Sequence, residues 1–547
     1  MRSIVAHGLA LAALLAAGVA DAAPPRLVKQ GTASQLVVDG KPMLLIAGEL
    51  GNSSASSTAY MAPHWPKLKA MGLNTVLAPV SWELIEPVEG RYDWSSVDNL
   101  IRDARANDLK LVILWFGAWK NSMSTYVPAW VKRDQARFPR AQLPNGQGVE
   151  ILSAFAPATR DADAKAFAAL LAHLKAIDSA RNTVLMVQVE NEIGMLPVAR
   201  EYGPAANAAF AQPVPRQLVD HLVAHRATLE PELKALWEEQ GAPTDGDWRT
   251  LFGEGDAAAE VFTAWNYAVF AEALTRAGKA EYPLPLYVNA ALNRFNKAPG
   301  EYPSGGPLPH LLDVWKAGAP SLDLLAPDIY FPSFVDLANR FKRPDNPLFI
   351  PEANNADKPE VPANAYYAFG QLDAIGFGPF SIESIDSAEP PPALSDAYAV
   401  LGQLAPAILA NQGLGRMAGF RPRVLEDGTV IDMPVTQRIG HYRFTVTFVD
   451  SQSPKADQNT AAHGGLIIQT GPEDYLVAGS GMIVTVKPVG KGPPLAGLDS
   501  AWEGTFDAQG RWIPGRLLNG DQTHQGRHLR LAPGKHQIQK VRLYRYR

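Results

Sequence analysis

Two glutamates stand directly after apolar, strand-like stretches and are the residues best placed to do chemistry. The first stretch, residues 187–192, reads Val-Gln-Val-Glu-Asn-Glu, and the second, residues 348–352, ends in Glu352. In an extended strand Glu190 and Glu192 share one face, while the valines share the other. Carboxylates at the C-terminal ends of barrel strands reach solvent and substrate. We therefore expect Glu192 and Glu352 to face each other across a central pocket.

Opposed carboxylates of this kind suit the cleavage of a glycosidic bond. The leaving oxygen needs a proton, while the oxocarbenium-like carbon needs a nucleophile or an activated water. A separation of about 5–5.5 Å lets the second carboxylate attack directly with retention, whereas about 6.5–9.5 Å admits a water and inverts the sugar. One glutamate must hold a proton at working pH, because two adjacent charges raise one pKa. For either glutamate alone, a structural salt bridge is the competing interpretation.

Eight short apolar runs alternate with helical patterns between about residues 36 and 410, which is typical of βα units and a parallel sheet. Helical periodicity is clear at 67–71 and 97–106, for example. No glycine-rich nucleotide motif follows any run, which favours an α/β fold of the (β/α)₈ TIM-barrel class over an open sheet. The predicted strands are 43–47, 75–79, 109–115, 183–189, 284–289, 322–329, 348–351 and 378–382.

Two further regions flank or interrupt this pattern. The span 193–282 is too long for one connection, and helical periodicity at 217–233 and 257–277 predicts an insertion of helices that either walls the barrel mouth or serves only as scaffold. From residue 415 to 547 period-two stretches predict a separate all-β sandwich or jelly roll. This domain has no paired acid and base, so we expect it to pack on the barrel or to bind sugar. The catalytic barrel is then residues 23–414.

The N-terminus has the pattern of a signal peptide. Arg2 supplies a positive charge, an apolar run follows, and Ala20-Asp21-Ala22 offers small residues for cleavage after Ala22. Residues 1–22 are therefore predicted to direct export, to the periplasm or out of the cell. No later stretch reaches about 18 uninterrupted apolar residues, so no membrane span is expected in the mature protein.

Composition narrows the choice of partners. A net charge of −5 argues against a nucleic-acid binder and suits an uncharged ligand. The chain has no cysteine, which excludes thiol nucleophiles and cysteine-bearing metal sites. His221 and His225 have ligand spacing on a helix, but Leu222 stands where a metalloprotease carries glutamate. We therefore expect neither metal nor cofactor, and the sequence leaves the oligomeric state open.

Residues 36–400 resemble glycoside hydrolase family 35, the β-galactosidases, which belong to the large clan of retaining (β/α)₈ glycosidases. The run over residues 187–194 looks like the family's Gln-Ile/Val-Glu-Asn-Glu-Tyr-Gly. Further matches are Gly48-Glu49, Gly-Leu-Asn-Thr-Val at 72–76 and Trp-Glu-Leu-Ile-Glu-Pro-Val-Glu-Gly-Arg-Tyr-Asp-Trp at 82–94, and the C-terminal domain looks like one appended in a bacterial branch. The resemblance implies that Glu192 is the acid/base, that Asn191 bonds the sugar 2-hydroxyl, and that Glu352 is the nucleophile.

Other candidates surround this pair. Tyr330 follows the sixth run and is expected to hydrogen-bond Glu352 and keep its pKa low, with a simply packed tyrosine as the alternative. Glu86 is a candidate for a sugar hydroxyl, or else for buried pairing with a cation. Trp82 and Trp119 are candidates for stacking on a sugar ring, or else for the core.

The predicted function is that of an exo-acting retaining β-glycosidase, a β-galactosidase on plant-type oligosaccharides. Two departures from the family bear on the sugar: Pro79 replaces a common tyrosine, and residues 117–122 replace a Gly-Pro-Tyr run that contacts galactose in relatives. The alternatives are an endo-mannanase or cellulase of the same fold, and a non-catalytic carbohydrate-binding barrel. A closed pocket would favour exo action, and an open groove endo action.

Overall fold

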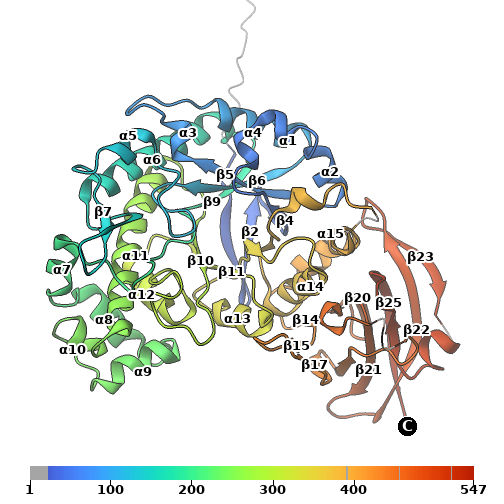
Figure 1. Cartoon of the computed structure of the whole chain (residues 1–547). Helices are drawn as coiled ribbons and strands as arrows, with labels where there is room; N and C mark the ends of the chain where they lie inside the picture. Colours follow the sequence, from blue (N-terminus) through green and yellow to red (C-terminus); the bar gives the residue numbers. More distant parts are fainter. Residues whose placement is uncertain (1–21, 390–391, 455, 457, 519) are drawn as a thin grey trace, which may run out of the picture.

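The computed structural model describes residues 22–389, 392–454, 456, 458–518 and 520–547 (Figure 1). The predicted signal peptide, apart from residue 22, lies outside the described residues.

A parallel eight-stranded barrel forms the first and larger part of the molecule, as predicted (Figure 1). Neighbouring strands pair in parallel in the order β12-β11-β10-β9-β6-β5-β4-β13, and the ends meet where the amide of Ile350 donates to Gly376 O (3.2 Å) and that of Gly378 to Ile350 O (2.9 Å). The strands are β4 (Leu45–Glu49), β5 (Thr75–Ser81), β6 (Lys110–Phe116), β9 (Val184–Gln188), β10 (Leu286–Ala291), β11 (Leu324–Ile329), β12 (Glu352–Ala353) and β13 (Gly376–Phe377).

The last two strands differ from the prediction. Residues 348–351 are buried, but the regular strand is β12, which begins at Glu352, and only Ile350 forms an isolated bridge to Phe377. The eighth strand, β13, lies two residues before the predicted run, and residues 382–385 form a 3₁₀ helix instead. Both runs are apolar because they are buried at the closing seam, and burial alone does not distinguish a strand from a buried turn.

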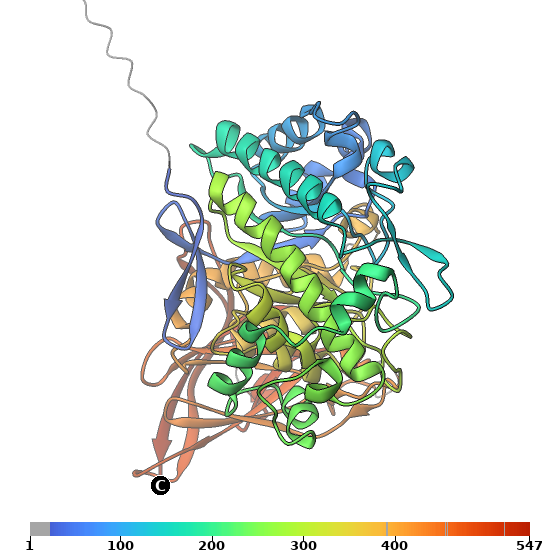
Figure 2. The ribbon, with the colours of Figure 1, turned by 90° about the vertical axis from the view of Figure 1, so that its left-hand side faces the viewer.

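The helices between the strands cover the outside of the barrel, and Figure 2 shows the two long helices α6 and α11 side by side on one flank. Before the insertion they are α1 (Thr58–Met61), α2 (Trp65–Ala70), α3 (Trp82–Ile85), α4 (Ser95–Ala106), α5 (Ala129–Arg133) and α6 (Pro157–Asp178), with a small hairpin β7 (Arg140–Gln142) and β8 (Gly148–Leu152). After it come α12 (Leu312–Gly318), α13 (Phe334–Phe341), α14 (Val361–Leu372) and α15 (Ala393–Asn411).

The predicted insertion is helical, and none of its described residues lines the pocket that contains Glu192 and Glu352. Its helix α11 packs on α6 and α12, in the place of an ordinary barrel helix. The predicted helix 217–233 is two helices, because Pro231 begins a new one after a break at residues 226–230. The helices are α7 (Pro204–Phe210), α8 (Arg216–His225), α9 (Pro231–Glu239), α10 (Trp248–Phe252) and α11 (Asp256–Glu281).

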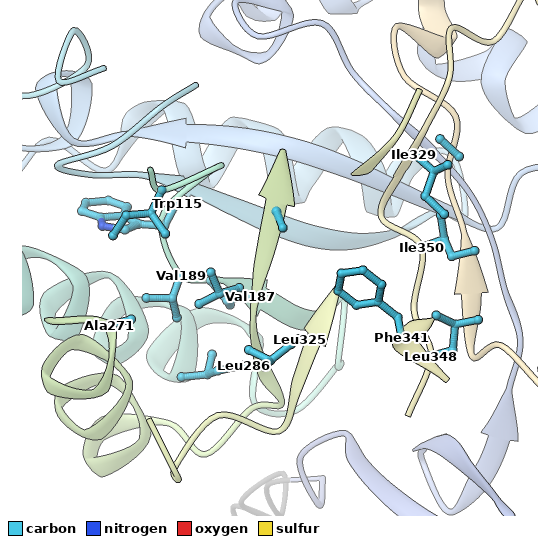
Figure 3. Close-up of a cluster of buried hydrophobic side chains, with 14 of the residues drawn as sticks. Trp115, Val187, Val189, Ala271, Leu286, Leu325, Ile329, Phe341, Leu348 and Ile350 are labelled. Carbon is cyan, nitrogen blue, oxygen red and sulfur yellow. The ribbon is translucent and has the colours of Figure 1, made fainter. Parts of the chain in front are cut away.

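Apolar side chains fill the space between strands and helices (Figure 3). Val187 and Val189 pack there beside Ala271 of α11, which is the outward face predicted for the two valines. The inside of the barrel holds a separate cluster, and Leu36 and Val38 of a small N-terminal sheet join it. That sheet is β1 (Arg26–Gln30), β2 (Ala33–Val38) and β3 (Lys41–Met43).

The C-terminal region is an antiparallel β-sandwich with its own core, as predicted. One sheet has six strands in the order β14-β19-β20-β25-β22-β23, and the other has four in the order β17-β18-β21-β24. The strands are β14 (Met417–Phe420), β15 (Arg423–Val424), β16 (Val430–Ile431), β17 (Val435–Ile439), β18 (Tyr442–Thr447), β19 (Gly464–Gln469), β20 (Asp474–Ser480), β21 (Met482–Pro488), β22 (Leu495–Phe506), β23 (Trp512–Leu517), β24 (Leu529–Leu531) and β25 (Gln537–Tyr546).

The six-stranded sheet packs directly on two barrel helices. Strands β14 and β19 contact α14, and β19 and β20 contact α15 (Figure 1). By length and composition α15 is the one described helix that could cross a membrane. Its apolar residues are instead divided between the barrel strand β4 and this sheet, as in the core helix of a globular protein.

Candidate active site

A pocket of about 510 Å³ opens at the carboxyl ends of the barrel strands and contains both predicted glutamates. Its volume lies within the range of about 300–1,000 Å³ that is usual for small-molecule sites. The lining residues are Asn52, Lys120, Asn121, Glu192, Ala291, Leu292, Arg294, Pro303, Asp328, Tyr330, Phe331, Glu352 and Phe380. Seven barrel strands or the loops after them therefore contribute to one site.

Three carboxyl groups converge in this pocket. Glu192, Asp328 and Glu352 each place one oxygen within 4.8 Å of an oxygen of the other two. All three residues are buried, and Asp328 Oδ1 and Glu352 Oε2 have no hydrogen-bond partner among the described residues. Of the described acidic and histidine residues, this is the one group close enough to share a cation, and it does not include His221 or His225.

Glu192 is held from two sides. Its Oε2 accepts a hydrogen bond from Asn121 Nδ2 (2.7 Å) in the loop after β6. Its backbone amide donates to Asn289 Oδ1 (2.9 Å) on β10, and Asn289 Nδ2 donates in turn to Asp328 Oδ2 (2.6 Å) on β11. Neighbouring strands thus fix both ends of the residue.

Burial and the nearby charge of Glu352 raise the pKa of Glu192 to about 7, against the lowering effect of Lys120. Burial also raises the pKa of Glu49 and that of Asp328 well above the usual range, again with help from Glu352. Removing a carboxylate from water disfavours its charged form, and a like charge nearby adds to the effect. The pocket therefore holds protons on several of its acids near neutral pH.

Glu352 receives the hydroxyl of Tyr330, as the sequence predicts, because the tyrosine donates to Glu352 Oε1. Burial and the Glu352 carboxylate raise the pKa of Tyr330, so the phenol stays protonated and remains a donor. The tyrosine is 37% exposed and lines the pocket, so it contacts the glutamate and the cavity together.

Glu190 does not share the pocket with Glu192, and the prediction that the two lie on one strand face is wrong. The strand β9 ends at Gln188, and both glutamates have left-handed backbone angles, with φ of 60° and 48°. Glu190 Oε2 accepts from the amide of Trp119 (2.7 Å), and burial beside Asp163 raises its pKa well above the usual range. Of these two glutamates, Glu192 is therefore the one that lines the pocket.

Asn191 is fully buried beside the pocket rather than on its surface. Its Oδ1 accepts from Lys120 Nζ (2.9 Å), and its Nδ2 has no partner among the described residues. The amide nitrogen is thus the free donor of this side chain, and Lys120 fixes which way the amide points.

Glu86 and Trp82 lie away from the pocket, which contradicts both as sugar contacts. The carboxylate of Glu86 accepts from Trp82 Nε1 (2.7 Å) and from the amide of Gly90 (2.7 Å). Trp82 is fully buried and packs edge-on against Trp130. The motif over residues 82–94 is therefore the short helix α3 and the turn after it, held by one carboxylate, with which no described Arg or Lys pairs.

Trp119 is likewise a core residue and not a stacking platform. Its ring is fully buried between Tyr267 and Phe270 of α11. The aromatic rings that do line the pocket are those of Tyr330, Phe331 and Phe380. The sequence left open that Trp119 is a core residue, and this is what the structure shows.

Sequence reasoning missed Asp328, Asn289, Glu49 and the pair Lys120-Asn121 as site residues. Except for Asn289, which lies inside β10, each stands near the end of a barrel strand or in the loop after it, which is the signal that also found the two glutamates. Asp328 was visible two residues before Tyr330, but its side chain could not be placed inside or outside the barrel without the register of β11.

Comparison with known proteins gives two family matches. "Glycosyl hydrolases family 35" matches residues 35–232, and "Domain of unknown function (DUF5597)" matches residues 394–530. A β-galactosidase of Xanthomonas manihotis is 32% identical over 201 residues, which are 34% of this chain and 30% of that protein. The chain therefore spans less than a third of the length of this curated relative.

Solved structures with a similar chain course include two β-galactosidases. That of the psychrophilic Marinomonas ef1 has a TM-score of 0.45 at 13% identity, over 68% of this chain and 61% of its own. That of Bacillus circulans sp. alkalophilus has a TM-score of 0.46 at 17% identity, over 67% of this chain and 57% of its own. The family match covers β4 to β9 with Glu192, and the resemblance to glycoside hydrolase family 35 is thereby confirmed over residues 35–232, a part of the chain that does not include Glu352.

Proposed function

We propose that the protein is a retaining exo-β-galactosidase that releases terminal galactose from plant-type oligosaccharides. The observation that carries this proposal is the placement of Glu192 and Glu352 in one pocket, with carboxyl oxygens within 4.8 Å of each other. This spacing favours direct attack over the wider separation of about 6.5–9.5 Å that an intervening water needs. The family match over the acid/base segment supports the reaction class.

In the proposed reaction Glu192 begins protonated, since its pKa is raised to about 7. It donates that proton to the leaving oxygen while Glu352 attacks the anomeric carbon and forms a glycosyl-enzyme. Tyr330 donates to Glu352 Oε1 and so holds the carboxylate in position for attack. Glu192 then removes a proton from water, which hydrolyses the intermediate.

The pocket chemistry supports a neutral sugar. Three acceptor atoms have no partner among the described residues and belong to lining residues, namely Asn52 Oδ1, Asp328 Oδ1 and Glu352 Oε2. Sugar hydroxyls can donate to such atoms, whereas an acidic sugar would add a further negative charge to a floor already crowded with carboxyl groups.

A panel of 4-nitrophenyl glycosides tests the proposal. We expect fastest turnover of the β-galactoside among galactoside, glucoside, mannoside and arabinoside, and NMR should show the β-anomer as the first product. Faster turnover of a mannoside or glucoside would replace galactose by that sugar. First release of the α-anomer would refute retention, and no turnover of any glycoside would favour a binding barrel.

Export is proposed on the sequence of residues 1–22. N-terminal sequencing of the protein from its native cells should give a mature chain that begins at Ala23. An intact Met1 in material from outside the cytoplasm would contradict this.

A further inference from the structure

The outer face of the six-stranded C-terminal sheet is only partly covered by the barrel. Alternate residues of β25 point to opposite sides: Val541 and Leu543 join the sandwich core, while Lys540, Arg542 and Tyr544 are exposed. The barrel covers the neighbouring part of the same face, where Leu476, Ala478 and Ile538 join the core of the barrel helices. A strip of this face therefore remains open beside the barrel.

Register brings aromatic and polar side chains together on that strip. Lys540 of β25 is paired with Trp502 of β22, and Arg542 with Ser500. On the other side of β25, Arg542 is paired with Asp474 of β20. Because paired residues in a sheet point to the same face, these side chains share the open strip. They line a cleft of about 380 Å³ together with Trp512 and Pro514 of β23, here called the Trp502 cleft.

Glycines stand beside two rings of this sheet. A methyl group on Gly504 would fall 2.6 Å from Cζ2 of Trp512, and one on Gly497 would fall 2.5 Å from Cε1 of Tyr544. Trp512 packs edge-on against Phe506 and contacts the core of the barrel helices, while Trp502 and Trp512 are both half-buried. Part of each indole therefore remains accessible in the cleft, and Tyr544, which is 48% exposed, lies outside its lining.

The polar groups at the cleft are available to a ligand. The nearest carboxylate oxygen to Arg542 Nε is 3.6 Å away on Asp474, and Arg542 is itself exposed, so this pair is weak. Lys540 forms no ion pair within 4.0 Å among the described residues. Donors of both cations, the Ser500 hydroxyl and the Asp474 carboxylate thus surround the two indoles. The two cations, Lys540 and Arg542, are balanced only when Asp499, 3.9 Å from Arg542 Nε, is counted with Asp474, and this near-neutral charge does not suit a polyanion.

We propose that the Trp502 cleft binds a neutral oligosaccharide, outside the catalytic pocket. A sugar ring offers an apolar C–H face to an aromatic ring and hydroxyls around its edge, and the cleft offers both partners. The choice of a sugar from plant-type polysaccharide rests on the proposed function of the barrel. The cleft itself does not depend on catalysis, so the two proposals can fail separately.

Affinity electrophoresis tests the cleft on the full chain. The parent carries Glu352→Gln so that it does not degrade the probes, which are galactomannan, arabinogalactan and a mixed-linkage β-glucan in the gel. We expect at least one probe to retard the parent, and Trp502→Ala with Trp512→Ala to weaken binding about 10-fold or more, since each aromatic contact contributes on the order of 1 kcal/mol. Trp94→Ala is the matched control, because Trp94 is a half-buried tryptophan on the barrel surface, and should bind as the parent does.

A second pair of variants avoids any doubt about folding. Lys540→Ser and Arg542→Ser change exposed side chains and should weaken binding without lowering the melting temperature. With Glu352 restored, the tryptophan variants should hydrolyse a small aryl galactoside as the unaltered chain does, which separates this proposal from that for the barrel. Undiminished retardation of both sets of variants, no retardation of the parent by any probe, or dimerisation that depends on Trp502 would overturn the inference.

Discussion

At the residue scale, Glu192 and Glu352 are near neighbours with different surroundings. Asn121 and Asn289 hold Glu192, whereas the hydroxyl of Tyr330 contacts Glu352. This difference supports the proposed roles, with the proton on Glu192 and attack by Glu352, and it leads to opposite expectations when each side chain is removed.

Glu192→Ala should slow hydrolysis of glycosides with poor leaving groups by about 10²–10⁴-fold, because those leaving groups need a proton. Activated aryl glycosides need none and should react nearly normally in the first step. Added azide should restore turnover and give a product with the configuration of the substrate. Glu352→Ala should instead lose activity on both substrate types and give the opposite anomer with azide. Equal loss on both substrate types for Glu192→Ala, without an azide effect, would contradict the roles.

Lys120→Met should move the alkaline limb of the pH profile upward. The active form of Glu192 is protonated, so kcat/KM falls as pH rises through its pKa of about 7. The Lys120 ammonium lowers that pKa, and removing it should therefore raise the pKa and extend activity to higher pH. The profile should be measured on a substrate with a poor leaving group. Lys132→Met, on the barrel surface beside Glu83, should leave the limb in place; an unmoved limb in Lys120→Met would be the contrary result.

At the element scale, the best-predicted strands are those with a long apolar sequence that is buried on both faces of the sheet, such as β6 and β11. The alternation argument placed Val187 and Val189 correctly but failed from Glu190 onward, two residues beyond β9, because Glu190 and Glu192 adopt left-handed backbone angles. The residue types at these positions do not predict a positive φ. Glycine or asparagine is the usual signal for it, and glutamate is not. The predicted positions of the closing strands β12 and β13 were shifted for a related reason. A strand of two residues is too short to show an alternating pattern.

Helix packing makes a matched pair of predictions. Ala at Gly278 of α11 would place its methyl group 2.5 Å from the buried Phe167 ring of α6, whereas at Gly402 of α15 the nearest atom is 3.9 Å away. Both substitutions gain about 1 kcal/mol of helix propensity. Only at Gly278 does the added methyl group overpack the core, which costs about 1–3 kcal/mol. Gly278→Ala should thus lower the melting temperature and Gly402→Ala should raise it. Calorimetry on both decides, and a stabilised Gly278→Ala would show that α6 and α11 can move apart.

At the scale of the whole molecule, the barrel and the appended sandwich could be recognised from sequence, because period-two texture replaces βα alternation near residue 415. The surfaces through which the two parts contact each other could not be predicted. The contact residues on α14, α15 and the sheet are apolar, and in the sequence they look like ordinary core residues. Gly370 of α14 shows how close the contact is: a methyl group there would lie 2.7 Å from Leu466 Cβ and 3.0 Å from Gly419 Cα.

A chain ending at residue 414 should therefore melt at a lower temperature than the full chain and aggregate more readily, because apolar residues of α14 and α15 become exposed. Its catalytic glutamates remain, so any soluble fraction should give the same first anomer as the full chain. Calorimetry and NMR of the product check the two halves of this expectation. A truncated barrel as stable as the full chain, or one that changes the anomer, would contradict it.

The helix α14 begins eight residues after Ala353, at the end of the strand that carries Glu352, and its other face lies against β14 and β19. The segment that carries Glu352 and the sandwich are thus linked through α14. A gene rearrangement that joins this barrel to a foreign module, or this module to a foreign barrel, would have to supply a new partner for α14. The two parts of the chain are consequently expected to be inherited, and to be engineered, as a single unit.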